Sequence, residues 1–212
     1  MARSPRKVKK TAAGFKEKLR DVDMAIHQVL LHVGAYDDPD QRMLDLGHTS
    51  NRVAKSLVLE LLRGYSMDEN DLCEQVRLFD AGDNKELVVQ TGIAFTSLCA
   101  HHMLPFHGHA TIGYLPGPKL IGLSKLSRIL DFYAARLQVQ ERLGAQVASF
   151  IHGNCLAQYA VVLLHAEHQC MTCRGVKKPG TCTTTSSIRP TSVSRELLNE
   201  FYLLAGQASA KR

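Results

Sequence analysis

The chain has 212 residues, of which 45% are hydrophobic and 22% are charged, enough for one large domain with an extension. No run of about 18 apolar residues occurs, and no apolar segment follows the basic N-terminus, so the sequence predicts neither a transmembrane helix nor a secretory signal. The formal net charge is +6, but the first ten residues hold five Lys and Arg and no acid. We therefore predict a basic disordered arm over residues 1–11 and expect neither nucleic acid nor membrane as a partner.

The region after the arm, residues 12–80, is predicted to be helical. Apolar residues recur at helical spacing over residues 12–34, and Gly34 is expected to end that helix. Thr49 or Ser50 is expected to cap a second helix that runs through residues 51–65, with Gly64 near its C-terminal end.

After the helical region the hydrophobic period changes to that of a strand. The apolar residues of segment 86–99 fall on odd positions and are expected on one face of the strand: Leu87, Val89, Ile93, Phe95 and Cys99. Residues 109–123 then predict a hairpin that turns at residues 116–118.

Two helices and two strands complete the predicted core. Ser124 is expected to cap a helix over residues 124–137, and a second helix follows over residues 138–153. Residues 158–175 and 181–188 predict strands, and residues 194–206 predict a short helix. This order predicts an α+β domain over residues 81–205, in which an antiparallel sheet is backed by two helices and followed by a C-terminal helix.

The six cysteines do not resemble a disulfide framework, because they are widely spread and no export signal precedes them. We expect reduced thiols in a cytoplasmic protein, with metal binding as the special case. Cys99 and His102 have C-x2-H spacing, and Cys170 and Cys173 have C-x2-C spacing. Together they imitate a four-ligand structural zinc site.

The period of the predicted strand argues against four ligands. It places His168, Cys170 and Arg174 on one face and Cys173 on the other. The simpler site is therefore Cys99, His102 and Cys170 with a fourth position open, which is the arrangement of catalytic zinc. The alternative is that both cysteines are buried small hydrophobes, as free cysteines often are.

Cationic residues suggest an anionic substrate. Arg174 would lie about 13 Å along the strand from Cys170, where it suits the far end of an elongated anion. A helix capped at Ser124 would present free backbone N–H groups beside Lys125 and Arg128. An ordinary capped surface helix would have the same pattern.

Several separated motifs carry a resemblance to GTP cyclohydrolase I over roughly residues 49–204: C-x-H-H, I-G-L-S-K-x-x-R, Q-V-Q-E-R-L and H-x-C-x-x-x-R-G. The resemblance implies the tunnelling fold, in which the sheets of a toroidal homodecamer join around a central barrel. It implies a reaction that converts GTP and water to formate and 7,8-dihydroneopterin triphosphate, with active sites at subunit interfaces.

Carried over position by position, the resemblance assigns zinc ligands, catalytic residues and substrate contacts. The zinc ligands are Cys99, His102 and Cys170, and the catalytic histidines are His101 and His168. The triphosphate contacts are Ser124, Lys125, Arg128 and Arg174, with Arg52 as a weaker match, and Gln140 and Glu141 match positions at the purine.

The sequence departs from the family pattern in three places. Ala100 replaces the glutamate of the usual C-E-H-H, Ser50 stands where a proline is usual, and Cys173 has no expected ligand role. Three other interpretations therefore stay open. They are a zinc-stapled binding protein completed by Cys173, a catalytically impaired homologue that binds GTP, and a related cyclohydrolase that serves a deazaguanine pathway.

Overall fold

The computed structural model describes residues 12–209, so the predicted basic arm lies outside the described residues. The chain divides into two compact units, one ending at Ser66 and the other beginning at Met67, and each is described by itself. Over the described part of the chain, no helix is both long and apolar enough to cross a membrane.

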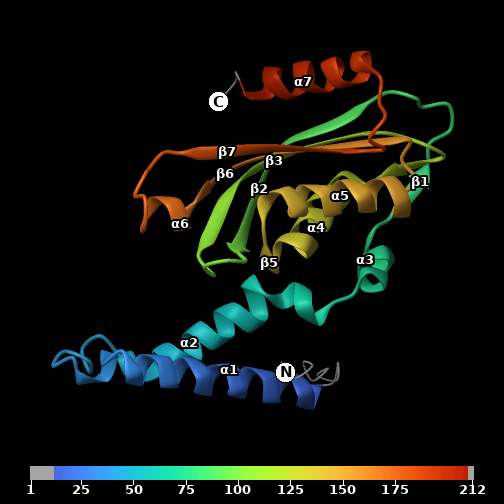
Figure 1. Cartoon of the computed structure of the whole chain (residues 1–212). Helices are drawn as coiled ribbons and strands as arrows, with labels where there is room; N and C mark the ends of the chain where they lie inside the picture. The colour runs from blue at the N-terminus through green and yellow to red at the C-terminus, as the bar shows by residue number, and fades with distance from the viewer. Residues whose placement is uncertain (1–11, 210–212) are drawn as a thin grey trace, which may run out of the picture. The chain divides into compact units, whose positions relative to one another are not determined.

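The first unit is helical, whereas the predicted helical region 12–80 extends beyond it and is wrong at its end, where residues Leu78–Asp80 form a strand. It contains α1 (Ala12–His32), the short helices η1 (Ala35–Asp37) and η2 (Leu46–His48), α2 (Thr49–Lys55), the π-helical segment η3 (Ser56–Leu61) and η4 (Arg63–Ser66). Helix α1 packs against α2 (Figure 1). The predicted cap is wrong: His48 occupies the N-cap position, while Ser50 lies inside the helix and its hydroxyl hydrogen-bonds the Asp23 carboxylate.

The second unit is built on a five-stranded sheet. Its helices are α3 (Glu69–Gln75), α4 (Leu123–Ala134), α5 (Gln140–Asn154), α6 (Gln169–Thr172) and α7 (Arg195–Ser209). Its strands are β1 (Leu78–Asp80), β2 (Val88–Cys99), β3 (Pro105–Leu115), β4 (Lys119–Ile121), β5 (Leu137–Gln138), β6 (Tyr159–His168) and β7 (Cys182–Arg189).

The sheet has the order β5-β2-β3-β6-β7, and every pairing is antiparallel except that of β5 with β2. Helices α4 and α5 cover one face of the sheet, and α7 lies on the other face (Figure 1). This arrangement confirms the predicted α+β class, an antiparallel sheet backed by two helices, and it agrees with the tunnelling fold.

Strand β2 does not keep one face over its whole length. From Gln90 to Ile93, β2 advances by three residues while its partner β3 advances by only two, from Ile112 to Ala110. This β-bulge, with Gly92 at a φ of 69°, reverses the side-chain alternation. The single-face prediction is therefore wrong: Ile93 and Phe95 pack under α4 and α5, whereas Leu87 and Val89 pack near α7.

The predicted hairpin over residues 109–123 is also wrong. Strand β4 follows β3 after a short turn but pairs with β1, in a separate two-stranded sheet. The buried Tyr114 hydroxyl accepts a hydrogen bond from the Ile121 N–H at 2.9 Å, which ties β4 to the end of β3. The turn therefore connects two sheets.

Helix α7 is held by one buried ring. Phe201 is fully buried among Tyr159 and Val161 of β6, and its ring lies where a Cβ on Gly113 would come within 2.6 Å. Burial of such a side chain contributes about 2 kcal/mol. Because Gly113 has no side chain, the Phe201 ring has room to pack there, and α7 docks on the sheet through it.

Candidate active site and metal centre

The turn between β2 and β3 positions the two adjacent histidines. The Cys99 N–H donates to the Leu104 carbonyl at 2.9 Å, and the Met103 N–H donates to the Cys99 carbonyl at 2.8 Å. Met103 adopts the left-handed backbone conformation, with a φ of 53°, which tightens the turn. His101 and His102 therefore project from a closed turn at the end of the sheet.

A second segment reaches the same end of the sheet from β6. The prediction of one strand through residue 175 is wrong, because β6 ends at His168 and residues Gln169–Thr172 form one helical turn, α6. The neighbouring strands provide the reason: β3 pairs with β6 as far as His168, and β7 only as far as Glu167. Beyond them the backbone satisfies its hydrogen bonds locally, with the Cys173 N–H donating to the Gln169 carbonyl at 3.0 Å.

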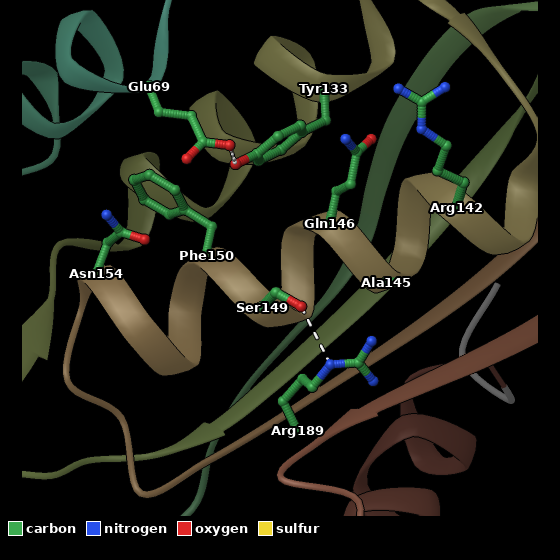
Figure 2. A pocket seen from close by; sticks show the side chains of 9 residues that line it. All are labelled: Glu69, Tyr133, Arg142, Ala145, Gln146, Ser149, Phe150, Asn154 and Arg189. Carbon is green, nitrogen blue, oxygen red and sulfur yellow. Dashed lines mark hydrogen bonds between the residues drawn. The ribbon is translucent and has the colours of Figure 1, made fainter.

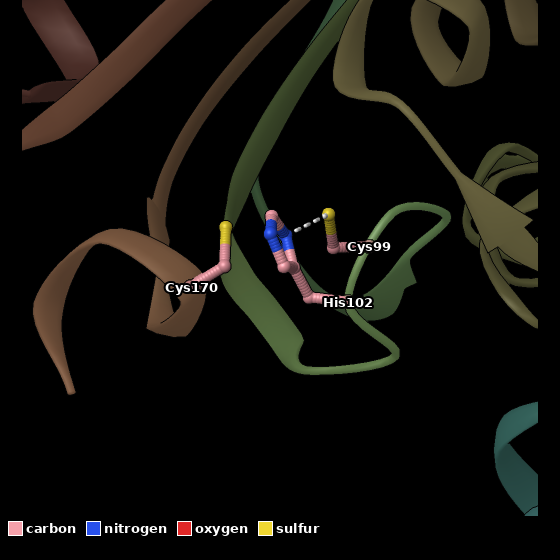
Figure 3. A group of neighbouring side chains, drawn as sticks. All are labelled: Cys99, His102 and Cys170. Atoms are coloured by element: carbon pink, nitrogen blue, oxygen red, sulfur yellow. Dashed lines mark hydrogen bonds between the residues drawn. The ribbon is translucent and has the colours of Figure 1, made fainter. Parts of the chain in front are cut away.

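These two segments bring together the three predicted ligands. One donor atom from each of Cys99, His102 and Cys170 lies within 4.8 Å of the others (Figure 3). The Cys99 Sγ atom is 3.7 Å from Nδ1 of His102. Tetrahedral zinc with ordinary bond lengths separates its donor atoms by about 3.5–3.8 Å, so this pair already has suitable spacing.

Cys173 takes no part in this cluster. It is exposed, at the end of α6, and the described residues offer no other metal-binding group of three or more side chains. The predicted exclusion of Cys173 therefore agrees with the structure, although the reason given for it, the opposite face of a continuous strand, does not hold.

The Cys99 thiol disfavours ionisation of the clustered Cys170 thiol. Burial raises the pKa of the Cys170 thiol above its ordinary value, the neighbouring Cys99 thiol raises it further, and Arg174 opposes both effects. Two thiolates at this distance require a positive partner between them. The cluster therefore fits a cation that binds sulfur and nitrogen.

His168 is held beside this cluster from two sides. Its ring stacks on the fully buried Phe106 ring, with centroids 4.6 Å apart and an angle of 2° between the planes. Its Nε2 atom lies 2.8 Å from Oε1 of Gln140, an atom that can only accept, so Nε2 carries the proton and Nδ1 keeps a free lone pair. Burial lowers the pKa of His168, and Glu141 acts in the opposite direction.

The Gln140 side chain is buried and fully used within the chain. Its Nε2 group donates to the carbonyls of Leu164 and Thr183 and to the Thr185 hydroxyl, at 3.0–3.1 Å, while its Oε1 atom accepts from His168. The side chain therefore orients the His168 ring. The contact between Gln140 and His168 was not predicted from the sequence, where its only sign is the alternation of glutamines in Gln-Val-Gln.

A cavity of about 210 Å³ lies over the cluster. Glu141, the exposed second residue of α5, lines it together with both adjacent histidines and His168. Gln138 also lines it and is tied to the turn, because its carbonyl accepts the Ala100 N–H at 2.8 Å. Sequence reasoning gave Gln138 no role.

The predicted cationic groups do not all lie at this cavity. Arg174 follows α6 and is near enough to act on Cys170. The start of α4 lies elsewhere: the contact of Tyr114 with Ile121 joins it to the far end of β3, eight residues from Phe106. At strand rise, Tyr114 lies about 26 Å from Phe106, so the first turn of α4 starts at the end of the sheet opposite the cavity. The helix then runs back along the sheet, and the carbonyl of its last residue, Ala134, accepts the hydroxyl of Ser97, which pairs with Phe106.

The N-terminus of α4 also differs from its prediction. Gly122 is the N-cap residue and makes no side-chain bond, so Ser124 lies in the first turn and does not cap the helix. Ser124 and Arg128 are exposed and Lys125 is half-buried, and the side chains of all three make no hydrogen bond or ion pair with another residue of the described range 12–209. Three donor-bearing side chains therefore stand unused at one helix end.

Arg52 lies in the first unit. Its guanidinium donates to a carboxylate oxygen of Asp45 at 2.7 Å and to the Asp45 carbonyl at 2.9 Å. These bonds lower the pKa of the Asp45 carboxyl, with a smaller contribution from His48.

Comparison with known proteins agrees with this geometry. The family model described as GTP cyclohydrolase I matches residues 22–204. The chain belongs to the GTP cyclohydrolase I family. It is 44% identical over 158 residues to the "GTP cyclohydrolase 1" of Gloeobacter violaceus, covering 74% of this chain and 72% of that protein.

Other proteins of the same name extend the similarity. That of Brevibacillus brevis is 43% identical over 173 residues, 81% of this chain and 88% of its own length. That of Dictyostelium discoideum is 39% identical over 172 residues, 81% of this chain and 71% of its own length. Bacterial and eukaryotic members of the GTP cyclohydrolase I family thus match most of the chain.

The cluster generates a prediction about metal content. Cys99→Ala, His102→Ala and Cys170→Ala should each abolish stoichiometric zinc, because two remaining ligands bind poorly. Cys173→Ser and Cys73→Ala should keep one zinc per chain, since both side chains are exposed and outside the cluster. Elemental analysis of the purified variants measures this, and a zinc-free Cys173→Ser protein would favour the four-ligand structural site.

Proposed function

We propose that this protein is a zinc-dependent GTP cyclohydrolase I that converts GTP and water to formate and 7,8-dihydroneopterin triphosphate. The observation that carries the proposal is the cluster of Cys99, His102 and Cys170 beside His168, in a chain that belongs to this family. A GTP-binding homologue without activity and a zinc-stapled binding protein are the competing functions.

Zinc fits the donor set. Two thiolates and one imidazole are ligands that zinc accepts, and three protein ligands leave one position for water or substrate. When bound, zinc supplies a Lewis acid that makes water nucleophilic near neutral pH. The exposed position of Cys173 supports an open fourth position over a closed structural site.

The two histidines are proposed to move the protons. The guanine C8 atom, which leaves as formate, must gain oxygen while the imidazole ring opens. Nδ1 of His168 can accept a proton, because Gln140 already holds Nε2 as a donor. His101, whose Nδ1 lies 3.9 Å from the Cys99 sulfur, is the second group that can exchange a proton there.

Recognition of GTP is proposed to use both ends of the site. Glu141 lines the cavity, and its carboxylate can accept hydrogen bonds from guanine N–H donors. Gln140 is proposed to act at the purine end indirectly, through the ring of His168. Arg174, beside Cys170, is proposed to bind the triphosphate.

Helix α4 begins at the end of the sheet opposite the cavity, and none of its residues Ser124, Lys125 and Arg128 lines that cavity. These three residues are therefore proposed to bind triphosphate at the cavity of another subunit. This supports a homodecamer with active sites at subunit interfaces, to which Arg52 would be contributed as well. The catalytic domain would comprise residues 81–205 of a cytoplasmic protein.

The proposal is tested by incubating the purified chain with GTP and zinc. Formate and a pterin that becomes fluorescent on oxidation should appear in a 1:1 ratio, because the same ring opening generates both. Cys170→Ala serves as the matched control. GTP binding without formate would favour the inactive homologue, and zinc without GTP binding would favour the zinc-stapled protein.

The anion contacts generate a prediction about affinity. Arg128→Ala and Arg174→Ala should each weaken GTP binding by about one to two decades and leave guanosine binding nearly unchanged, because each removes a charge-assisted hydrogen bond to phosphate. Arg195→Ala, an exposed arginine at the start of α7, is the control. Calorimetry measures both ligands, and an equal loss for GTP and guanosine would place these residues elsewhere.

Ala100 generates a prediction about rate. A carboxylate at position 100, between Cys99 and His101, could orient a histidine ring and raise its basicity, which alanine cannot do. Ala100→Glu should therefore speed single-turnover formate release at saturating GTP by about 10-fold or more, with zinc content unchanged. Ala100→Gln, which has the same length without the charge, is the control. Equal rates of formate release for the unmodified protein and both variants would show that the side chain at position 100 has no role in the reaction.

A further inference from the structure

A second cavity lies outside the candidate reaction site. It has a volume of about 330 Å³ and is bordered by the outward face of α5, by Glu69 of α3 and Tyr133 of α4, and by Arg189 of β7 (Figure 2). We call it the α5 cavity. None of the predicted catalytic, metal-binding or substrate-binding residues lines it.

Hydrogen-bond donors dominate this cavity. Gln146 accepts from Gln138 through Oε1, which fixes the orientation of its amide and leaves the Nε2 group free to donate. Arg189 donates from Nε to the Ser149 hydroxyl at 3.1 Å and from Nη1 to the Ile188 carbonyl at 2.7 Å. Its Nη2 group therefore remains available, on a guanidinium that is already oriented.

Arg142 adds a second cation without a partner. Its side chain is exposed and has no hydrogen bond or ion pair with any residue between 12 and 209. Residues 142, 146 and 149 follow the i, i+4, i+7 pattern, so their side chains line one face of α5 over about 10 Å. Figure 2 shows Gln146 and Ser149 between the two arginines along this face.

Acceptors are scarce in the same cavity. Glu69 is the only acidic residue of its lining, and one of its carboxylate oxygens already accepts the Tyr133 hydroxyl at 2.8 Å. Two guanidiniums, a free amide N–H₂ and a hydroxyl therefore face one partly engaged carboxylate and the amide oxygen of Asn154. The complement of such a surface is a small molecule rich in acceptors and negative charge, and guanidiniums are suited to its carboxylate or phosphate groups.

We propose that the α5 cavity binds a small multivalent oxyanion, a phosphate ester or a polycarboxylate, through Arg142, Gln146 and Arg189. The volume suits a compact ligand of this kind, at the lower end of the range of small-molecule sites. This site is additional to the cyclohydrolase function and does not depend on it, because it shares no lining residue with the reaction cavity.

Calorimetry of the full-length protein without GTP tests the proposal, with pyrophosphate and citrate as separate probes. At least one probe should bind, and the probe that binds identifies the chemical class. Arg142→Gln and Arg189→Gln should each weaken it by about 10-fold or more. Arg128→Gln, at the proposed triphosphate contact, should leave that binding event unchanged. Arg142→Gln is the cleaner variant, because the exposed Arg142 side chain makes no hydrogen bond or ion pair with residues 12–209.

Hydrogen exchange locates the bound probe independently. Peptides from the first three turns of α5 and from the end of β7 should exchange more slowly when the probe is present. The proposal is overturned if neither probe binds the unmodified protein. It is equally overturned if Arg128→Gln abolishes all binding, or if protection appears only in the turn after Cys99 and in residues 170–174.

Discussion

The candidate site depends on the antiparallel register of β2, β3 and β6. This register places the turn after Cys99 and the end of β6 at one edge of the sheet, with Phe106 opposite His168. A slip of one residue would reverse every side chain, remove the Phe106 ring from His168 and separate Cys170 from Cys99. The metal cluster is therefore a consequence of strand pairing, and the turn and α6 only complete it.

The sequence predicted the ligand set better than it predicted the backbone that carries it. Cys99, His102 and Cys170 were selected from residue type, spacing and a strand period, and the structure brings these three together. The period was the wrong reason, since Cys170 lies in a helical turn. Local periodicity cannot show where a strand loses its neighbours, because that depends on the lengths of β3 and β7.

Other features could not be predicted from the local sequence pattern for similar reasons. The bulge at Gly92 and the pairing of β4 with β1 are set by contacts between distant segments. The role of Gln140 as the partner of His168 requires α5 to start beside the end of β6. The separation of the start of α4 from the cluster, by contrast, is a property of the single chain, and it leads to the proposal of a site shared between subunits.

We propose that three residues, and not four, hold zinc beside His168. X-ray absorption at the zinc edge of the purified protein tests it most directly, because zinc–sulfur bonds near 2.3 Å are distinct from zinc–nitrogen and zinc–oxygen bonds near 2.0–2.1 Å. We predict two sulfur neighbours and two light-atom neighbours, and GTP should change only the light-atom neighbours. Three sulfur neighbours, with one lost in Cys173→Ser, would contradict it and assign the metal a structural role.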